Sequence, residues 1–377
     1  MKNKMLPEGF LPGEYIREEA EERGWTPTDL AAILGCKPNI VSDLFAGRRS
    51  ISAELAKALG DAFGTGAQVW LNLQSAYRLA TTSSADDAVA RRARLYEKAP
   101  ISDMLRRGWI EGSTNINVLE AEICRFLEID SIDQEVVFQH AARKSTRYES
   151  LNSTQLAWLK RAKKLAEALP VEGPYSSRNF DGLLEEIEVL KYEPEELRHL
   201  PGILSKYGIR FLILEHLPKT KIDGACFWLD EQSPVIVLSL RYDRIDWFWH
   251  SLIHELSHIK NRDGLKQPVI ENKMFGEGSQ PTDEKPSIEK RADAFAVATL
   301  IDQNELKDFI NRNHPTYSRS SIIGFSRRIG IHRGIIVGQL QHRGRVPYSH
   351  FRAMLVKIRN IITATALTDG WGKTVSL

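Results

Sequence analysis

The chain has 377 residues, enough for roughly two or three domains with substantial cores. Its net charge of +2 is too small to indicate nucleic-acid binding by itself, and its three widely spaced cysteines form neither a zinc knuckle nor a disulfide framework. No segment is long and apolar enough to span a membrane, and the first residues lack the apolar run of a signal peptide. These features predict a cytoplasmic protein without a membrane partner.

Residues 12–80 show short helical patterns with clear start and stop signals. Thr26 is a suitable helix N-cap and Pro27 suits the first helical turn, whereas Gly35 suits the left-handed end of a helix. Helices are therefore predicted at Glu14–Arg23, Thr26–Leu34, Pro38–Ala46, Ile51–Phe63 and Ala67–Leu79.

The second and third of these helices have the spacing of a helix-turn-helix. Ala31 is a small residue where the helices cross, Gly35 allows a tight turn, and Val41 gives an apolar inner face. The third helix would enter the major groove of double-stranded DNA. We expect DNA contacts from Lys37, Asn39, Ser42, Arg48 and Arg49.

The overall charge of this region gives little attraction for DNA, because residues 1–80 hold nine Lys or Arg and ten Asp or Glu. Binding should therefore depend on a homodimer that brings two basic clusters to two half-sites. A five-helix protein-interaction module is the alternative.

The segment from Leu11 to Ala80 resembles the HigA-type antitoxin domain, which is an XRE-like helix-turn-helix. The matching residues are Pro12-Gly13-Glu14, Ile51-Ser52 and Trp70-Leu71-Asn72-Leu73-Gln74. The resemblance implies a dimer that binds operator DNA and represses its own operon. It also implies, less directly, a toxin as a protein partner.

Residues 81–180 are predicted as a helical linker region. A charged helical pattern runs from Leu156 to Leu169. The arginines earlier in the region are typical of a solvated helical face, and nucleic-acid contact is the alternative; they are Arg91, Arg92, Arg94, Arg106 and Arg107. The Pro- and Gly-containing segment 170–174 then marks a domain boundary.

Residues 181–350 are predicted as a domain in which a small sheet precedes two helices. Strand patterns occur at Ile209–Glu215, Gly224–Asp230 and Val235–Leu240. Residues 351–377 are expected to form a C-terminal helix and tail. The whole chain is therefore predicted to be mainly α with a small β-sheet, in the α+β class.

The segment His254-Glu255-Leu256-Ser257-His258 has the H-E-x-x-H pattern of zinc proteases. Residues four apart on a helix share one face, so both imidazoles can bind one zinc ion, and Glu255 can take a proton from water beside it. The helix Asp246–Lys260 is apolar over most of its circumference and should be buried, where a metal would give its polar groups a partner. A core helix with hydrogen-bonded histidines is the alternative.

A third zinc ligand is expected on the helix Ser287–Ile301. Glu289 and Asp293 lie four residues apart on it, and hence on one face. We predict that Glu289 binds zinc and that Asp293 accepts a hydrogen bond from the far nitrogen of a ligating histidine. This pair resembles the arrangement in thermolysin-like gluzincins.

Other residues compete for the place of Glu289. His250 lies one turn before His254, but three histidines along one straight helix cannot converge on one ion, so we expect it only to support the site. Carboxylates in the predicted loop between the two helices hold a ligand geometry less rigidly than residues on a helix do, so we rank them below Glu289. They are Asp263, Glu271, Asp283 and Glu284.

Residues 185–345 resemble the ImmA/IrrE family of zincin-like metallopeptidases. Besides H-E-x-x-H, the family signature E-x-x-A-[ND]-x-F-A is present at Glu289–Ala296. The resemblance implies that Glu289 binds zinc and that the substrate is a repressor or another regulatory protein. In this chain Arg291 replaces a frequent glutamate, Asp293 a frequent asparagine, and His250 a frequent aromatic residue.

The sequence thus predicts a DNA-binding regulator or antitoxin-like protein with a zinc metallo-endopeptidase domain. Zn²⁺ would activate water and polarise the scissile carbonyl, while Glu255 would accept the proton and pass it to the leaving amine. His332, His342 and Tyr348 are candidates for stabilising the oxyanion. The alternative is a non-enzymatic HigA-type antitoxin and autorepressor that binds a toxin and operator DNA, and whose peptidase-like domain senses or docks a partner.

Overall fold

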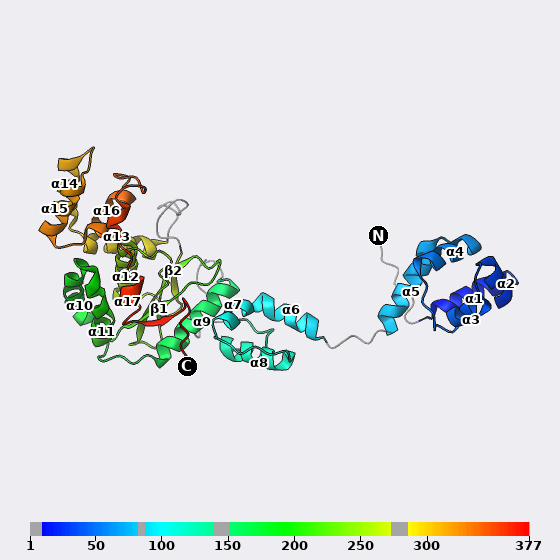
Figure 1. Cartoon of the computed structure of the whole chain (residues 1–377). Coiled ribbons are helices and arrows are strands. Elements are labelled where there is room, and N and C mark those ends of the chain that lie inside the picture. Colours follow the sequence, from blue (N-terminus) through cyan, green and yellow to red (C-terminus); the bar gives the residue numbers. More distant parts are fainter. Residues whose placement is uncertain (1–9, 82–86, 137, 139–150, 273–285, 377) are drawn as a thin grey trace. The chain divides into compact units, whose positions relative to one another are not determined.

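The computed structural model describes residues 10–81, 87–136, 138, 151–272 and 286–376. The chain divides into two compact units, Met1–Ala90 and Arg91–Leu377, each with a core of its own (Figure 1). Among the described helices, none combines the length and the apolar character needed to cross a lipid bilayer.

The described elements of the first unit are all helices. Capping residues and glycines in the sequence mark several of their ends. The Thr26 side chain accepts a hydrogen bond from the Asp29 N–H, and the Asp29 carboxylate accepts one from the Thr26 N–H. Gly35 follows the second helix with a φ of 63°. Leu30 and Trp70 lie in the core. The helices are α1 Pro12–Glu22, α2 Pro27–Ile33, α3 Pro38–Phe45, α4 Ala53–Phe63 and α5 Ala67–Thr81.

Four further helices follow from residue 88 onward, and nearly all of their residues belong to the second unit. They are α6 Ala88–Lys98, α7 Ile101–Arg106, α8 Ile116–Leu127 and α9 Ser153–Ala168. Trp158 of α9 donates a hydrogen bond to the Glu215 carbonyl at 3.1 Å, and Arg161 donates to the Asp369 carboxylate at 2.6 Å. Much of the region that we predicted as a linker, residues 81–180, therefore contributes buried contacts to this unit.

The described residues of the second unit form a five-stranded mixed sheet with the order β4-β2-β3-β1-β5. β1 pairs in parallel with β3 and β5, whereas β2 pairs antiparallel with β3 and β4. β5 comes from the C-terminal segment, for which the sequence predicted only a helix and a tail. The strands are β1 Arg210–Leu214, β2 Ile222–Trp228, β3 Pro234–Leu238, β4 Val269–Asn272 and β5 Leu367–Asp369. Together with the helices, this sheet confirms the predicted α+β class.

Helix α12, Ile245–Lys260, lies against β2 and β3 and also packs on α13, Ser287–Leu300, and α16, Arg333–His342 (Figure 1). Every residue from Ile245 to Ile259 is buried, so the H-E-x-x-H segment lies inside the second unit. The other helices of this unit are α10 Phe180–Glu188, α11 Leu200–Lys206, α14 Gln303–Asn313, α15 Arg319–Ile329 and α17 Arg359–Ile362, with 3₁₀ turns at Ser177–Asn179, Val189–Lys191, Pro194–His199 and Arg352–Met354.

Candidate metal centre and DNA-binding face

Two histidines of α12 and one glutamate of α13 converge inside the second unit. The Nε2 atoms of His254 and His258 lie 3.1 Å apart, and both side chains are completely buried. Glu289 Oε2 lies 3.1 Å from His254 Nε2, and Glu289 Oε1 lies 3.7 Å from His258 Nε2. The structure therefore brings together the three residues that the sequence predicted as ligands.

The spacing of these donor atoms fits a small tetrahedral cation. An ion about 2.1 Å from each donor keeps its donors about 3.4 Å apart, and the observed separations fall on both sides of that value. Two imidazoles and one carboxylate are also a donor set that suits zinc. His254, His258 and Glu289 could therefore hold Zn²⁺.

Carboxylates face the far nitrogens of both rings. Asp293 Oδ1 lies 3.0 Å from His254 Nδ1, and Asp263 Oδ2 lies 3.0 Å from His258 Nδ1. Arg291 donates to the same oxygen of Asp263 at 2.7 Å. A carboxylate in this position keeps the ring proton on Nδ1 and leaves Nε2 free to bind a metal.

The competing carboxylates do not occupy the position of Glu289. Asp263 contacts His258 only through Nδ1, as described above. Glu271 Oε1 lies 3.7 Å from His254 Nδ1, and it belongs to strand β4 rather than to a loop as we predicted. Asp283 and Glu284 lie outside the described residues.

The acidic surroundings change the pKa of His254. Burial alone lowers it, but the carboxylates of Glu271, Asp293 and Glu289 outweigh burial and raise the pKa well above its ordinary value. Without a metal, the site thus favours a positive charge on this ring. A cation that displaces the proton would meet the same carboxylates.

Glu255, the predicted general base, is completely buried, and neither of its carboxylate oxygens has a hydrogen-bond partner among the described residues. Burial raises the pKa of this carboxyl to about 8; His254 opposes the shift, whereas Glu289 and Asp223 add to it. A buried polar group without a partner is costly, which points to a group that binds there. A pKa near neutrality also suits general acid–base chemistry.

Glu255 fits beside β2 because the strand has a glycine at this point. A Cβ at Gly224 would lie 2.5 Å from Glu255 Oε1 and 3.1 Å from the Leu238 side chain, and both neighbours are buried. We expect Gly224→Ala to destabilise the second unit by roughly 1–3 kcal/mol, because the added Cβ forces two buried side chains to shift. Urea unfolding followed by circular dichroism measures this change. Gly202→Ala is the control, since a Cβ at Gly202 meets nothing within 4 Å; equal effects of the two substitutions would contradict the expectation.

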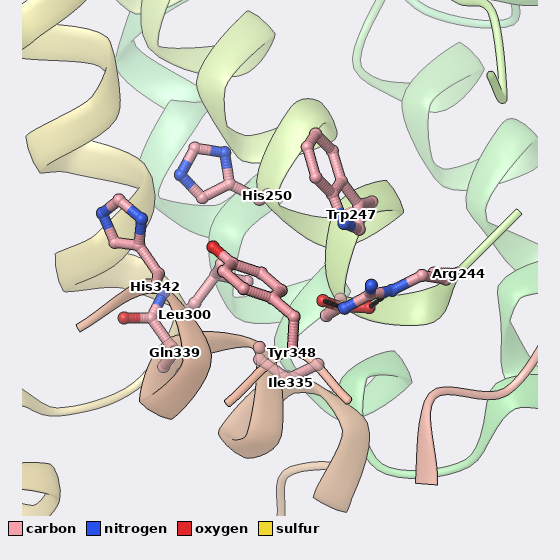
Figure 2. Close-up of a pocket in the computed structure, with 10 residues that line it drawn as sticks. Arg244, Trp247, His250, Leu300, Ile335, Gln339, His342 and Tyr348 are labelled. Carbon is pink, nitrogen blue, oxygen red and sulfur yellow. Dashed lines mark hydrogen bonds and ion pairs between the residues drawn. The ribbon is translucent and has the colours of Figure 1, made fainter. Parts of the chain in front are cut away.

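A pocket lies one turn before the H-E-x-x-H segment (Figure 2). His250 lines it, and the ring centroids of His250 and His254 are 6.2 Å apart. His342 and Tyr348 line it as well, and the Tyr348 hydroxyl points toward the two histidines of the pocket. Two of the three candidates for oxyanion stabilisation therefore lie near the candidate metal centre.

His332, the third candidate, is used differently. It is the N-cap of α16, where its Nδ1 accepts a hydrogen bond from the Gly334 N–H at 3.1 Å. Burial, together with the charge of Arg333, lowers the pKa of His332 to about 4. The imidazole is therefore neutral and serves to begin a helix.

All of the residues that were predicted to contact DNA are exposed on the first unit, at or beside α3. Arg48 donates a hydrogen bond to the Asp43 carboxylate at 2.9 Å. Arg49 has no ion pair of this kind among the described residues, which leaves it more available for a phosphate. The exposed residues are Lys37, Asn39, Ser42, Arg48 and Arg49.

The first unit matches known proteins. A family model described as helix-turn-helix matches residues 16–70. The Escherichia coli (strain K12) protein named uncharacterized HTH-type transcriptional regulator YddM is 33% identical over 84 residues, which are 22% of this chain and 88% of that protein. Through its first unit, the chain belongs to the helix-turn-helix family. The prediction of a helix-turn-helix in this part of the chain is thus confirmed.

Further relatives of the helix-turn-helix unit are known. Virulence-associated protein I of Dichelobacter nodosus is 39% identical over 79 residues, which are 21% of this chain and 71% of that protein. The solved structure of the Pseudomonas aeruginosa antitoxin HigA with the higBA promoter is 39% identical, covers 22% of this chain and 91% of that one, and has a TM-score of 0.21. By sequence, the first unit resembles the helix-turn-helix of a transcriptional regulator.

Proposed function

We propose that this chain joins a helix-turn-helix regulator to a zinc-dependent endopeptidase. The observation that carries the proposal is the convergence of His254 Nε2, His258 Nε2 and the Glu289 carboxylate, with pair distances of 3.1, 3.1 and 3.7 Å. The resemblance of residues 185–345 to the ImmA/IrrE metallopeptidases supports it. That resemblance also favours a repressor or another regulatory protein as the substrate.

Zn²⁺ bound by these residues would supply a Lewis acid that polarises the scissile carbonyl and makes water a better nucleophile. The carboxylates of Asp293 and Asp263 would hold the two imidazoles in place through their Nδ1 protons. Glu255 would take up the proton that water loses and pass it to the leaving amine. Both oxygens of its carboxyl lack partners among the described residues, so either is available for this proton.

The direct test is metal-dependent cleavage by the full chain. The purified protein should hold about one zinc ion per chain and should cleave a helix-turn-helix repressor or unfolded casein. A chelator should stop the cleavage, and added zinc should restore it. A folded protein that takes up no zinc and cleaves neither substrate after zinc is added would contradict the proposal.

We infer that the first unit binds double-stranded operator DNA as a homodimer. The helix-turn-helix match over residues 16–70 and the relative named as a transcriptional regulator support DNA as the partner. The exposed polar side chains at α3 provide base and phosphate contacts. A dimer would double the small basic cluster formed by Lys37, Arg48 and Arg49.

Arg49→Ala should weaken binding to all DNA sequences by a similar factor, because a phosphate contact carries no sequence information. In a plot of log affinity against log salt, the slope should fall by about 1 for each half-site. Fluorescence anisotropy with the chain's own promoter DNA measures both effects. Lys57→Ala, which removes another exposed basic side chain from α4, is the control. A slope that responds equally to both substitutions would refute the role of Arg49.

A further inference from the structure

We propose that the pocket beside the candidate metal centre receives one side chain of the substrate, and that it selects threonine or serine. This proposal rests on the proposed peptidase function. His250 lines the pocket, and its ring centroid is 6.2 Å from the ring centroid of the candidate ligand His254. Neighbouring residues of an extended chain are about 3.3–3.6 Å apart, so a peptide bond at the metal places a flanking side chain within reach of the pocket.

The size of the pocket limits the side chain to a short one. Its cavity volume is about 40 Å³. One water molecule needs roughly 10–15 Å³ on this measure, so the pocket holds roughly three non-hydrogen atoms. Trp247, Leu300 and Ile335 form apolar walls, and all three are themselves buried in the core. A threonine side chain fits this space, whereas leucine and phenylalanine are too large.

The charges in the pocket already neutralise each other. Arg244 donates to the two oxygens of Asp246 at 3.1 and 2.7 Å, and it also donates to the Gln341 side chain at 3.2 Å. Asp246 is only 9% exposed. A charged substrate side chain would lose its hydration there and would find the opposite charge occupied. The pocket therefore favours an uncharged side chain.

The side-chain amide of Gln339 selects a substrate side chain that carries a hydroxyl group. The residue is 5% exposed, and its Oε1 is buried without a hydrogen-bond partner among the described residues. It lies beside His342 and Tyr348 at the pocket (Figure 2). A buried acceptor without a donor is costly. In Figure 2 this oxygen lies on the side of the amide away from Tyr348 and has almost no accessible surface, so the amide must turn before a substrate hydroxyl can donate to it. A hydroxyl can pair with the amide in either orientation, because it both donates and accepts.

Hydroxamates that carry different amino-acid side chains test this selection without a known substrate, because the hydroxamate binds zinc directly. Two series are needed, with the side chain on either side of the chelating group. Threonine and valine have nearly the same shape and differ by one hydroxyl group. In the series whose side chain enters the pocket, the zinc-loaded chain should bind the threonine compound about three- to tenfold more tightly than the valine compound. The leucine, phenylalanine and aspartate compounds should bind more weakly than the threonine compound in isothermal titration calorimetry.

Gln339→Leu removes the acceptor and should abolish the preference for threonine over valine without changing the zinc content. Asn311→Ala, an exposed position on α14, is the control and should keep the preference. Equal binding of the threonine and valine compounds in both series by zinc-loaded protein would overturn this assignment but not the peptidase proposal. A chain that binds no zinc would overturn both. If Gln339→Leu does not fold, the comparison of the threonine and valine compounds on the unaltered chain still tests the assignment.

Discussion

Glu255→Gln should abolish peptide cleavage and leave the zinc in place. Glutamine has nearly the shape of glutamate but cannot accept a proton, and the loss of a general base typically costs about 10²–10⁴-fold in rate. The three candidate ligands are untouched by the substitution, so about one zinc ion per chain should remain. Mass spectrometry of the products and elemental analysis of the protein measure the two results. Glu305→Gln, which alters an exposed carboxylate on α14, should leave cleavage unchanged.

The same substitution should cost little stability, because neither oxygen of Glu255 has a hydrogen-bond partner to lose among the described residues. Burial raises the pKa of this carboxyl in the metal-free protein and so disfavours its charged form, and the neutral amide therefore removes little favourable charge interaction. Cleavage that survives Glu255→Gln would refute its role as the base. Relief of repression in cells that survives it would favour the non-enzymatic regulator instead.

The helix boundaries that could be predicted from the sequence are those with local causes. α2 was predicted as Thr26–Leu34 and is found at Pro27–Ile33, because a capping residue, a proline and a glycine all lie within the segment or next to it. α12 was predicted as Asp246–Lys260 and is found at Ile245–Lys260. Its apolar residues and its three histidines repeat with the period of a helix, and recognising that period needs no knowledge of the rest of the fold.

The remaining structure depends on segments that lie far apart in the sequence. Arg161 looks like a solvated residue of a charged helix, yet it is 4% exposed and bonds to Asp369, 208 positions later. β5 has three residues in a polar C-terminal segment, and its pairing with β1 gives it a strand conformation that no alternation predicts. Strand pairings as short as that of β1 with β5 can be recognised in the folded sheet but not in the sequence.

The residues of the candidate metal centre could likewise be predicted from the sequence only in part. His254, His258 and Glu289 could be predicted because the helical period fixes which side chains share a face. Asp263 was considered only as a rival ligand, since the fold of its loop decides that it meets Nδ1 of His258 instead. Gln339, whose Oε1 has no hydrogen-bond partner among the described residues, lies on α16, almost eighty residues after the end of α12, and no motif indicated it.

His258→Ala should remove zinc from the chain. Only two of the three donors would remain, and the contact between the Asp263 carboxylate and Nδ1 of the ring would be lost as well. Asp263→Asn provides a graded comparison: it should weaken zinc binding by about 10–100-fold without preventing it, because Asp263 only orients the ring. Zinc titrations followed by calorimetry would rank the three proteins.

The effect of zinc on thermal unfolding gives a second measurement that does not depend on any substrate. Free zinc at about 1,000 times its Kd should stabilise the second unit by about 4 kcal/mol, whereas His258→Ala should show no response to zinc or to a chelator. The comparison is made within each protein, so a cavity left by the missing imidazole does not affect it. If His258→Ala still held one zinc ion per chain, the metal would bind elsewhere. The endopeptidase proposal would then lose its basis, while the helix-turn-helix unit, whose helices contain none of these residues, would be unaffected.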